Sequence, residues 1–187
     1  MTNMSISEKI SPKIYSKNEF ITEVLKIEKN YNESFPLPPS SPVRKELLGI
    51  KEYITMSYPG DIVIEIPIKD PPDFIIICNN KLKFCYEVTT IYDHSNEINY
   101  SKNKFFNQSE IHLKSLILDR VLKKSCKYFE KYSLLIVIDH PIANIRNSYN
   151  RVLGQIMNEK INGGNFIKII AINLSLNLSH TIFTEKN

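Results

Sequence analysis

The stretch PPDFIIICNNKLKFCYEVTT, residues Pro71 to Thr90, decides the fold. Two runs rich in β-branched and aromatic residues flank the polar segment NNK at 79–81. Asparagine tolerates the left-handed backbone that a tight turn requires, so the pattern predicts a β-hairpin with strands over 73–78 and 82–91. Before it, DIVIEIPI at 61–68 alternates isoleucine with other residues, as a half-covered strand does. We therefore expect an antiparallel meander of three strands.

The segments around this meander predict an α/β fold. Helical spacing of apolar residues predicts four helices, and two continuous apolar runs predict further strands. The helices cover 18–31, 42–56, 109–132 and 142–161, with Gly163 and Gly164 capping the last, and the strands cover 134–139 and 166–174. This order predicts a mixed sheet in which the antiparallel meander is followed by right-handed helix–strand crossovers.

The chain is predicted to form a single domain over residues 1–187. Its hydrophobic content of 42% is sufficient for one core. Residues 1–42 hold the first helix and a proline-rich arm, SFPLPPSSP, whose prolines exclude a helix interior. Residues 43–174 form the predicted core.

Composition limits where the protein works and what it binds. The three cysteines form no CxxC pair, which argues against a zinc knuckle or a disulfide framework and favours a reducing compartment. The N-terminus lacks an apolar leader, and no long uncharged apolar run is present, so we expect a soluble cytoplasmic protein without a membrane partner. A net charge of +4 permits a polyanionic partner without requiring one. The sequence leaves open whether the chain forms a homodimer.

The helix predicted over 109–132 has an apolar and a basic face. Ser109 is its expected N-cap. The apolar face contains Leu118, Val121, Leu122, Ser125 and Phe129. The basic face contains Arg120, Lys123, Lys124, Lys127 and Lys131. Such a basic stripe can follow the phosphate backbone of DNA, and an ordinary solvated helix surface is the alternative.

Two carboxylates mark the ends of the hairpin. If the turn uses residues 79–81, Asp73 faces Glu87, and their Cβ atoms lie about 4.5 to 5.5 Å apart on the same face. Oxygen ligands at that spacing suit Mg²⁺ or Mn²⁺, whose shell water and substrate phosphate complete. A two- or four-residue turn would place the two side chains on opposite faces. The alternative is that Asp73 caps a turn and Glu87 is an ordinary strand-end charge.

The residues PDF, a short hairpin and then EVT resemble the PD-(D/E)xK nuclease superfamily, which has the restriction-endonuclease-like fold. The order of predicted elements is similar to that of the superfamily over roughly Val43 to Ile138. The resemblance implies a two-carboxylate site that binds Mg²⁺ or Mn²⁺ and hydrolyses DNA. Asp73 would be the first acid and Glu87 the second, each a metal ligand and a catalytic residue.

One position departs from the superfamily's pattern. Thr89 stands where the motif has lysine, on the same face as Glu87 but without a charge that could stabilise the reacting phosphate. The resemblance allows this lysine to have moved to the following helix. Lys114, one turn before Leu118, is the first candidate, and Lys124 is the second. Alternatively, both are surface lysines whose stems lie along the helix.

Other residues are weaker candidates for a site. Glu46 and Glu52 lie on the predicted helix before the meander, where the superfamily often supplies a third acid. Asp139 and His140 follow a buried strand, at the end of the sheet where α/β proteins bind ligands. Two functions remain. The first is a metal-dependent nuclease acting on DNA, and the second is a catalytically silent nucleic-acid-binding or interaction module on the same fold.

Overall fold

The computed structural model describes residues 10–34, 42–68, 71–79, 81–92, 105–125, 131–159 and 163–185. These residues form an α/β fold. Along the chain the elements are β1 (Ile14–Ser16), α1 (Lys17–Ser34), α2 (Pro42–Ser57), β2 (Val63–Glu65), β3 (Phe74–Cys78), β4 (Leu82–Tyr92), α3 (Phe105–Ser125), β5 (Tyr132–Asp139), the short 3₁₀ helix η2 (Pro141–Asn144), α4 (Arg146–Asn158), β6 (Phe166–Asn173) and β7 (Leu178–Thr184).

The strands form one seven-stranded mixed sheet in the order β1-β2-β3-β4-β5-β6-β7. Strands β1 to β4 pair antiparallel, β4, β5 and β6 pair parallel, and β7 returns antiparallel to β6. The predicted α/β class, the mixed sheet and its antiparallel meander are confirmed. The edge strands β1 and β7 were not expected from the sequence, because β1 is very short and β7 carries few long apolar side chains.

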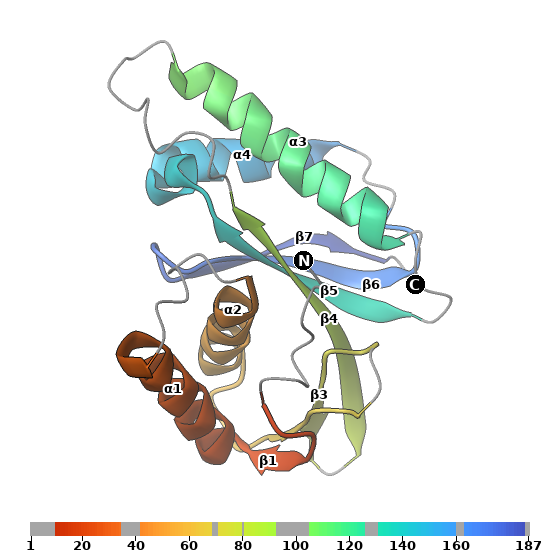
Figure 1. Ribbon diagram of the computed structural model, residues 1–187. Coiled ribbons are helices and arrows are strands. Elements are labelled where there is room, and N and C mark those ends of the chain that lie inside the picture. The colour runs from red at the N-terminus through yellow and green to blue at the C-terminus, as the bar shows by residue number, and fades with distance from the viewer. Residues whose placement is uncertain are drawn as a thin grey trace.

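Helices cover both faces of the sheet (Figure 1). Helices α1 and α2 enclose one buried cluster against β1 to β6, and α3 and α4 enclose a second cluster against the opposite face. Strand β5 alternates between them, with Leu135 and Val137 in the first cluster and Leu134 and Ile136 in the second. The prediction that residues 134–139 are covered on both faces is therefore confirmed.

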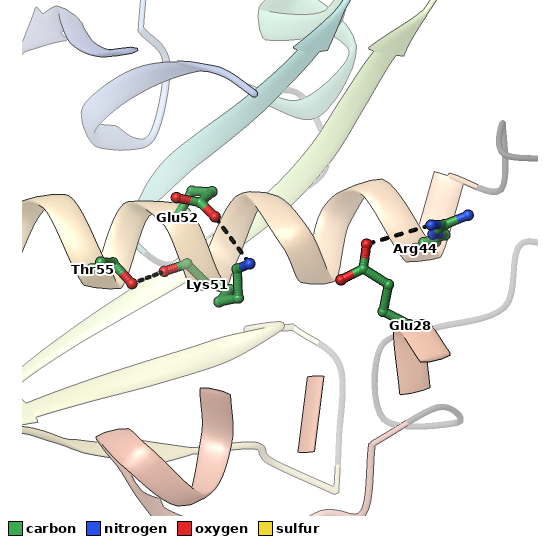
Figure 2. Close-up of polar contacts among 5 residues, drawn as sticks. All are labelled: Glu28, Arg44, Lys51, Glu52 and Thr55. Atoms are coloured by element: carbon green, nitrogen blue, oxygen red, sulfur yellow. Dashed lines mark hydrogen bonds and ion pairs between the residues drawn. The ribbon is translucent and has the colours of Figure 1, made fainter. Parts of the chain in front are cut away.

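Helix α2 lies very close to the sheet. A Cβ atom added at Gly49 would come 2.1 Å from Cγ2 of Val137 on β5, so only glycine permits this approach. The helix is also tied to α1, because Arg44 Nη2 lies 3.4 Å from Glu28 Oε1 (Figure 2). These contacts determine which residues of α2 reach the sheet edge.

Helix α3 differs from its prediction in both start and orientation. It begins at Phe105, so Ser109 lies inside the helix and is not its N-cap. Its buried face contains Leu113, Ile117 and Val121, whereas Leu122 is 60% exposed. Apolar residues surround much of this helix and form two competing series at four-residue spacing. Packing against β5 and α4, which sequence periodicity does not report, selects one of them.

Three other boundaries are corrected. Strand β2 covers only Val63–Glu65, and Ile68 is 84% exposed. Residues 141–144 form the 3₁₀ helix before α4, which ends at Asn158. The glycines do not cap it: Gly164 has φ +56° in the turn before β6, where the N–H of Phe166 donates to the carbonyl of Gly163 at 3.0 Å.

Candidate functional site

The register of the β3–β4 hairpin is the one expected from a turn at 79–81. Cys78 pairs with Leu82, and Ile75 pairs with Cys85. The ladder ends where Phe74 pairs with Tyr86, but β4 continues to Tyr92. Beyond Tyr86, β4 is therefore paired with β5 on one side and with no strand of the described residues on the other. This free edge of β4 is where the candidate residues meet.

Asp73 lies at the point where β3 leaves β4. Its backbone N–H donates to the carbonyl of Tyr86 at 2.9 Å, and its Oδ2 accepts a 2.7 Å hydrogen bond from the N–H of Val88. The N–H groups of a strand lie in the plane of the sheet. The carboxylate of Asp73 thus lies along the free edge, directly beside the residue that follows Glu87.

Glu87 projects toward the face covered by α3. Its side chain is buried, with 3% of its surface exposed, and Oε1 forms an ion pair with the ammonium of Lys124 on α3. The Lys124 side chain is itself only 19% exposed. A buried carboxylate needs such a charged donor, because burial without one strongly disfavours the ionised form.

Glu46 is the third acid at this edge, and it comes from α2. Its carboxyl group accepts a hydrogen bond from the backbone N–H of Thr90. Burial, with a smaller effect from the negative charge of Glu87, raises the pKa of Glu46 to about 7, even though the nearby charges of Lys124 and Arg120 act to lower it. The pKa of Glu46 therefore depends on charged residues of both β4 and α3, and Glu46 is partly protonated near neutral pH.

We call Glu46, Asp73, Glu87, Lys124 and Arg120 the carboxylate site. Along the free edge of β4, Asp73 and Glu46 accept from N–H groups two residues apart, a separation of about 7 Å along a strand. Two basic side chains of α3 balance the three acids. The site is therefore an acidic centre at the sheet edge where β3 leaves β4. Its Glu46 carboxyl group is close to its pKa at neutral pH.

Aromatic residues pack at the point where β3 leaves β4, on the face of the sheet opposite Glu87. Phe74 and Tyr86 stack with ring centroids 4.7 Å apart, and the Tyr86 hydroxyl lies 3.0 Å from that of Tyr53 and 2.8 Å from that of Tyr58. Burial raises the pKa of Tyr86 and of Tyr53, so both phenols stay neutral. This cluster fixes the backbone just before Glu87.

The lysine at Glu87 is Lys124, the second of the two candidates. Lys114, the first candidate, forms an ion pair with Glu159, which follows α4. Thr89 is buried on the same face as Glu87. The orientation of α3 explains why Lys124 and not Lys114 is the lysine at Glu87. The buried face of the helix contains Leu113, Ile117 and Val121, and this turns Lys114 toward α4 and Lys124 toward β4.

The expected basic face of α3 is divided. Arg120 and Lys124 lie at the carboxylate site. Lys123 is 73% exposed and lies 3.9 Å from Asp119. Lys127 is outside the described residues.

Two other sets of candidates lie away from the carboxylate site. Glu52 forms an ion pair with its neighbour Lys51 at 3.0 Å on α2 (Figure 2). Asp139 is paired with Lys45, and the ring of buried His140 accepts the N–H of Ile142 at 3.2 Å, which caps η2. These structural interactions, within α2 for Glu52, between α2 and β5 for Asp139 and at the start of η2 for His140, account for all three residues.

The carboxylate site was only partly accessible from sequence. Asp73 and Glu87 follow from the hairpin pattern. Helical spacing also separates the two glutamates of α2, because Glu46 borders the apolar face of Leu47 and Ile50 whereas Glu52 lies on the far side. The close approach of Gly49 to Val137, which brings this face of α2 to the sheet, is not evident from the sequence.

Carboxylate oxygens are the ligands that Mg²⁺ and Mn²⁺ prefer. Within the described ranges, no three His, Cys, Asp or Glu side chains are grouped in an arrangement set to hold a metal ion. Asp73, Glu87 and Glu46 nevertheless supply such oxygens at one edge of β4, and Glu87 is near enough to Glu46 to add to the larger effect of burial on its pKa. To bind one ion, the carboxylates would have to turn from their present donors.

No family model, curated protein or solved structure matches the chain. None of the helices in the described part of the chain combines the length and hydropathy needed to cross a bilayer.

Proposed function

We propose that the protein is a metal-dependent nuclease that hydrolyses DNA phosphodiester bonds. The observation that carries this proposal is the carboxylate site, where Asp73 just before β3, acids of α2 and β4, and a lysine of α3 meet at the free edge of β4. The order α2-β2-β3-β4-α3-β5 also agrees with a restriction-endonuclease-like fold. Because Cys78 and Cys85 are free thiols, we place this activity in the reducing cytoplasm.

In this proposal the residues have separate roles. Asp73 and Glu87 hold Mg²⁺ or Mn²⁺, and Glu46 supplies a third oxygen ligand once it is ionised. The bound ion would activate water and neutralise charge on the phosphate. Lys124 would take the place that Thr89 leaves vacant: its ammonium lies at Glu87 and would stabilise negative charge on the reacting phosphate. Arg120 contributes a second positive charge on the same helix.

A second candidate function is a catalytically silent nucleic-acid-binding module. It is favoured by the hydrogen bonds and ion pair that already engage the three acids: Asp73 with Val88, Glu46 with Thr90 and Glu87 with Lys124. In that case Lys124 serves as a permanent internal cation. The basic residues of α3 would then bind the phosphate backbone without cleavage.

Cleavage assays separate these functions. Purified protein should cut plasmid or single-stranded DNA in Mg²⁺ or Mn²⁺, and EDTA should stop the reaction. Asp73→Ala and Glu87→Ala should each remove most activity, and the double variant should be little worse, because groups that act as a unit are not additive. Lys124→Ala should lower the rate about 10²- to 10³-fold, the effect of losing one charge stabiliser.

The matched controls are Lys114→Ala and Glu52→Gln, which change the same residue types outside the carboxylate site. Both should cleave at nearly the wild-type rate. DNA binding without cleavage in any metal or substrate would favour the silent module. Absence of both DNA binding and cleavage would reject both functions.

A further inference from the structure

Strands β1, β2 and β3 have one covered face and one open face. On the face of α1 and α2, Tyr15, Ile64 and Ile76 are almost fully buried in the first cluster. Residues directly opposite one another in neighbouring strands project to the same face. The pairings Ile14 with Glu65, Glu65 with Ile75 and Val63 with Ile77 therefore define the other side.

We call this side the outer face. It contains Ile14, Val63, Glu65, Ile75, Ile77 and Lys83. Ile14 is 63% exposed, and Val63, Ile75 and Ile77 belong to neither buried cluster. Within the described residues no helix packs on this face as α1 and α2 do on the opposite one. Figure 1 shows the β3 end of the sheet extending past α3.

The sequence of β3 does not suit a solvated face. A strand with one face in water alternates apolar with polar residues, whereas continuous aliphatic runs are typical of strands covered on both faces. Strand β3 reads FIIIC, so its outward residues Ile75 and Ile77 are as apolar as its buried ones. Ile75, Ile77 and Val63 are half-buried and Ile14 is exposed, and contiguous apolar surface that remains partly open to solvent marks an interaction site.

The charges on the outer face indicate which partner fits. Lys83 Nζ lies 3.6 Å from Glu65 Oε2, across β3. A surface with one positive and one negative group does not attract a polyanion, but it is complementary to itself. A two-fold axis lying in the interface, halfway between these groups, would place each Glu65 over the Lys83 of another copy.

We propose that the outer face binds a second copy of this chain, sheet face to sheet face, about a two-fold axis. Ile75 and Ile77 form the apolar centre, Ile14 and Val63 extend it toward β1, and Glu65 and Lys83 form two reciprocal ion pairs. The outer face ends at β4, where α3 covers the Glu87 side chain, which is only 3% exposed. The inference is independent of the proposed function.

Light scattering during size exclusion tests this dimer through matched isoleucine variants. The wild-type chain should have twice the single-chain mass of 21.7 kDa at high concentration. Ile14→Glu should shift it to the single-chain mass, because the added carboxylate would be buried directly beside Glu65, its partner in the β1–β2 ladder. Ile111→Glu, at a 67% exposed isoleucine of α3, should leave the dimer unchanged. Both positions are exposed, so neither variant should impair folding.

Charge variants test the reciprocal ion pairs. Glu65→Lys and Lys83→Glu should each weaken the dimer at least about tenfold through like-charge contacts. An equimolar mixture of the two should restore association, because one copy is then positive and the other negative, and the double exchange should form a dimer alone. A single-chain mass for the wild type at every concentration would overturn the proposal. A doubled mass that survives all these substitutions would equally overturn it.

Discussion

The two halves of β4 satisfy the backbone N–H groups along one strand edge in different ways. From Leu82 to Tyr86, the edge that faces β3 is paired with the backbone of another strand. From Glu87 onward, N–H groups of the same edge are met by carboxylates, at Val88 by Asp73 and at Thr90 by Glu46. Unpaired backbone donors need acceptors in both halves. Only the second half gathers negative charge in doing so.

This difference explains why acidic and basic side chains gather at this edge of β4. A backbone carbonyl satisfies a donor without adding net charge, whereas each carboxylate adds charge that must be balanced. Glu87 is balanced by Lys124, and Glu46 responds by a raised pKa. The half of β4 from Glu87 onward therefore responds to changes in nearby charge, whereas the half from Leu82 to Tyr86 does not.

The largest expected effect on stability is the loss of Lys124. Lys124→Ala would leave Glu87 buried without its counter-charge, and removing one partner of a buried pair costs about 3 to 5 kcal/mol. Lys114→Ala, which breaks a pair whose glutamate is 46% exposed, should cost no more than about 1 kcal/mol. Urea unfolding of both variants measures the difference.

The Lys124 comparison has an internal control. Adding Glu87→Gln to Lys124→Ala removes the uncompensated charge and should recover much of the lost stability. Equal costs for Lys124→Ala and Lys114→Ala would show that Glu87 is not a buried charge and would contradict the difference between the two halves of β4.

Glu46 should make stability depend on pH. Its folded-state pKa is raised from 4.5 to about 7, so the folded protein holds a proton that the unfolded chain has released between these values. The free energy of unfolding should therefore fall as pH rises from about 4.5 to 7, by on the order of 2 to 3 kcal/mol in total. Glu46→Gln should match the wild type near pH 4 and be the more stable protein at pH 8.

The matched control for Glu46 is Glu52, on the same helix. Glu52→Gln removes a surface ion pair with Lys51 and should change stability by less than about 1 kcal/mol, without the pH dependence of Glu46→Gln. Identical pH profiles for the two variants would contradict the position assigned to Glu46. Thermal unfolding at closely spaced pH values provides the measurement.

The smallest expected effect concerns exposed lysines and DNA. Lys123→Glu should weaken DNA binding similarly for all sequences and lower the salt dependence of the binding constant by about one phosphate contact. Lys131→Glu, at an exposed lysine that lies outside α3 and is paired with Glu185, is the control and should have less effect. Fluorescence anisotropy over a range of salt concentrations distinguishes them.

The parts of the fold that follow from the sequence are those with strong local patterns. The hairpin register depends on the turn at 79–81, and β5 is a continuous apolar run, so both were predictable. The choice of Lys124 over Lys114 was not, because apolar residues surround much of α3 and its rotation depends on α4 and β5. The role of Glu46 depends likewise on the close contact of Gly49 with Val137.

The central claim is that the free edge of β4 holds a cation-binding set of carboxylates, and calorimetric titration with Mn²⁺ tests it most directly. We expect one Mn²⁺ per chain, displaced by Mg²⁺ and bound more tightly as pH rises through about 7, where Glu46 ionises. Glu87→Gln should abolish binding, and Glu52→Gln should retain it. No binding by the wild-type protein, or equal binding by both variants, would contradict the claim.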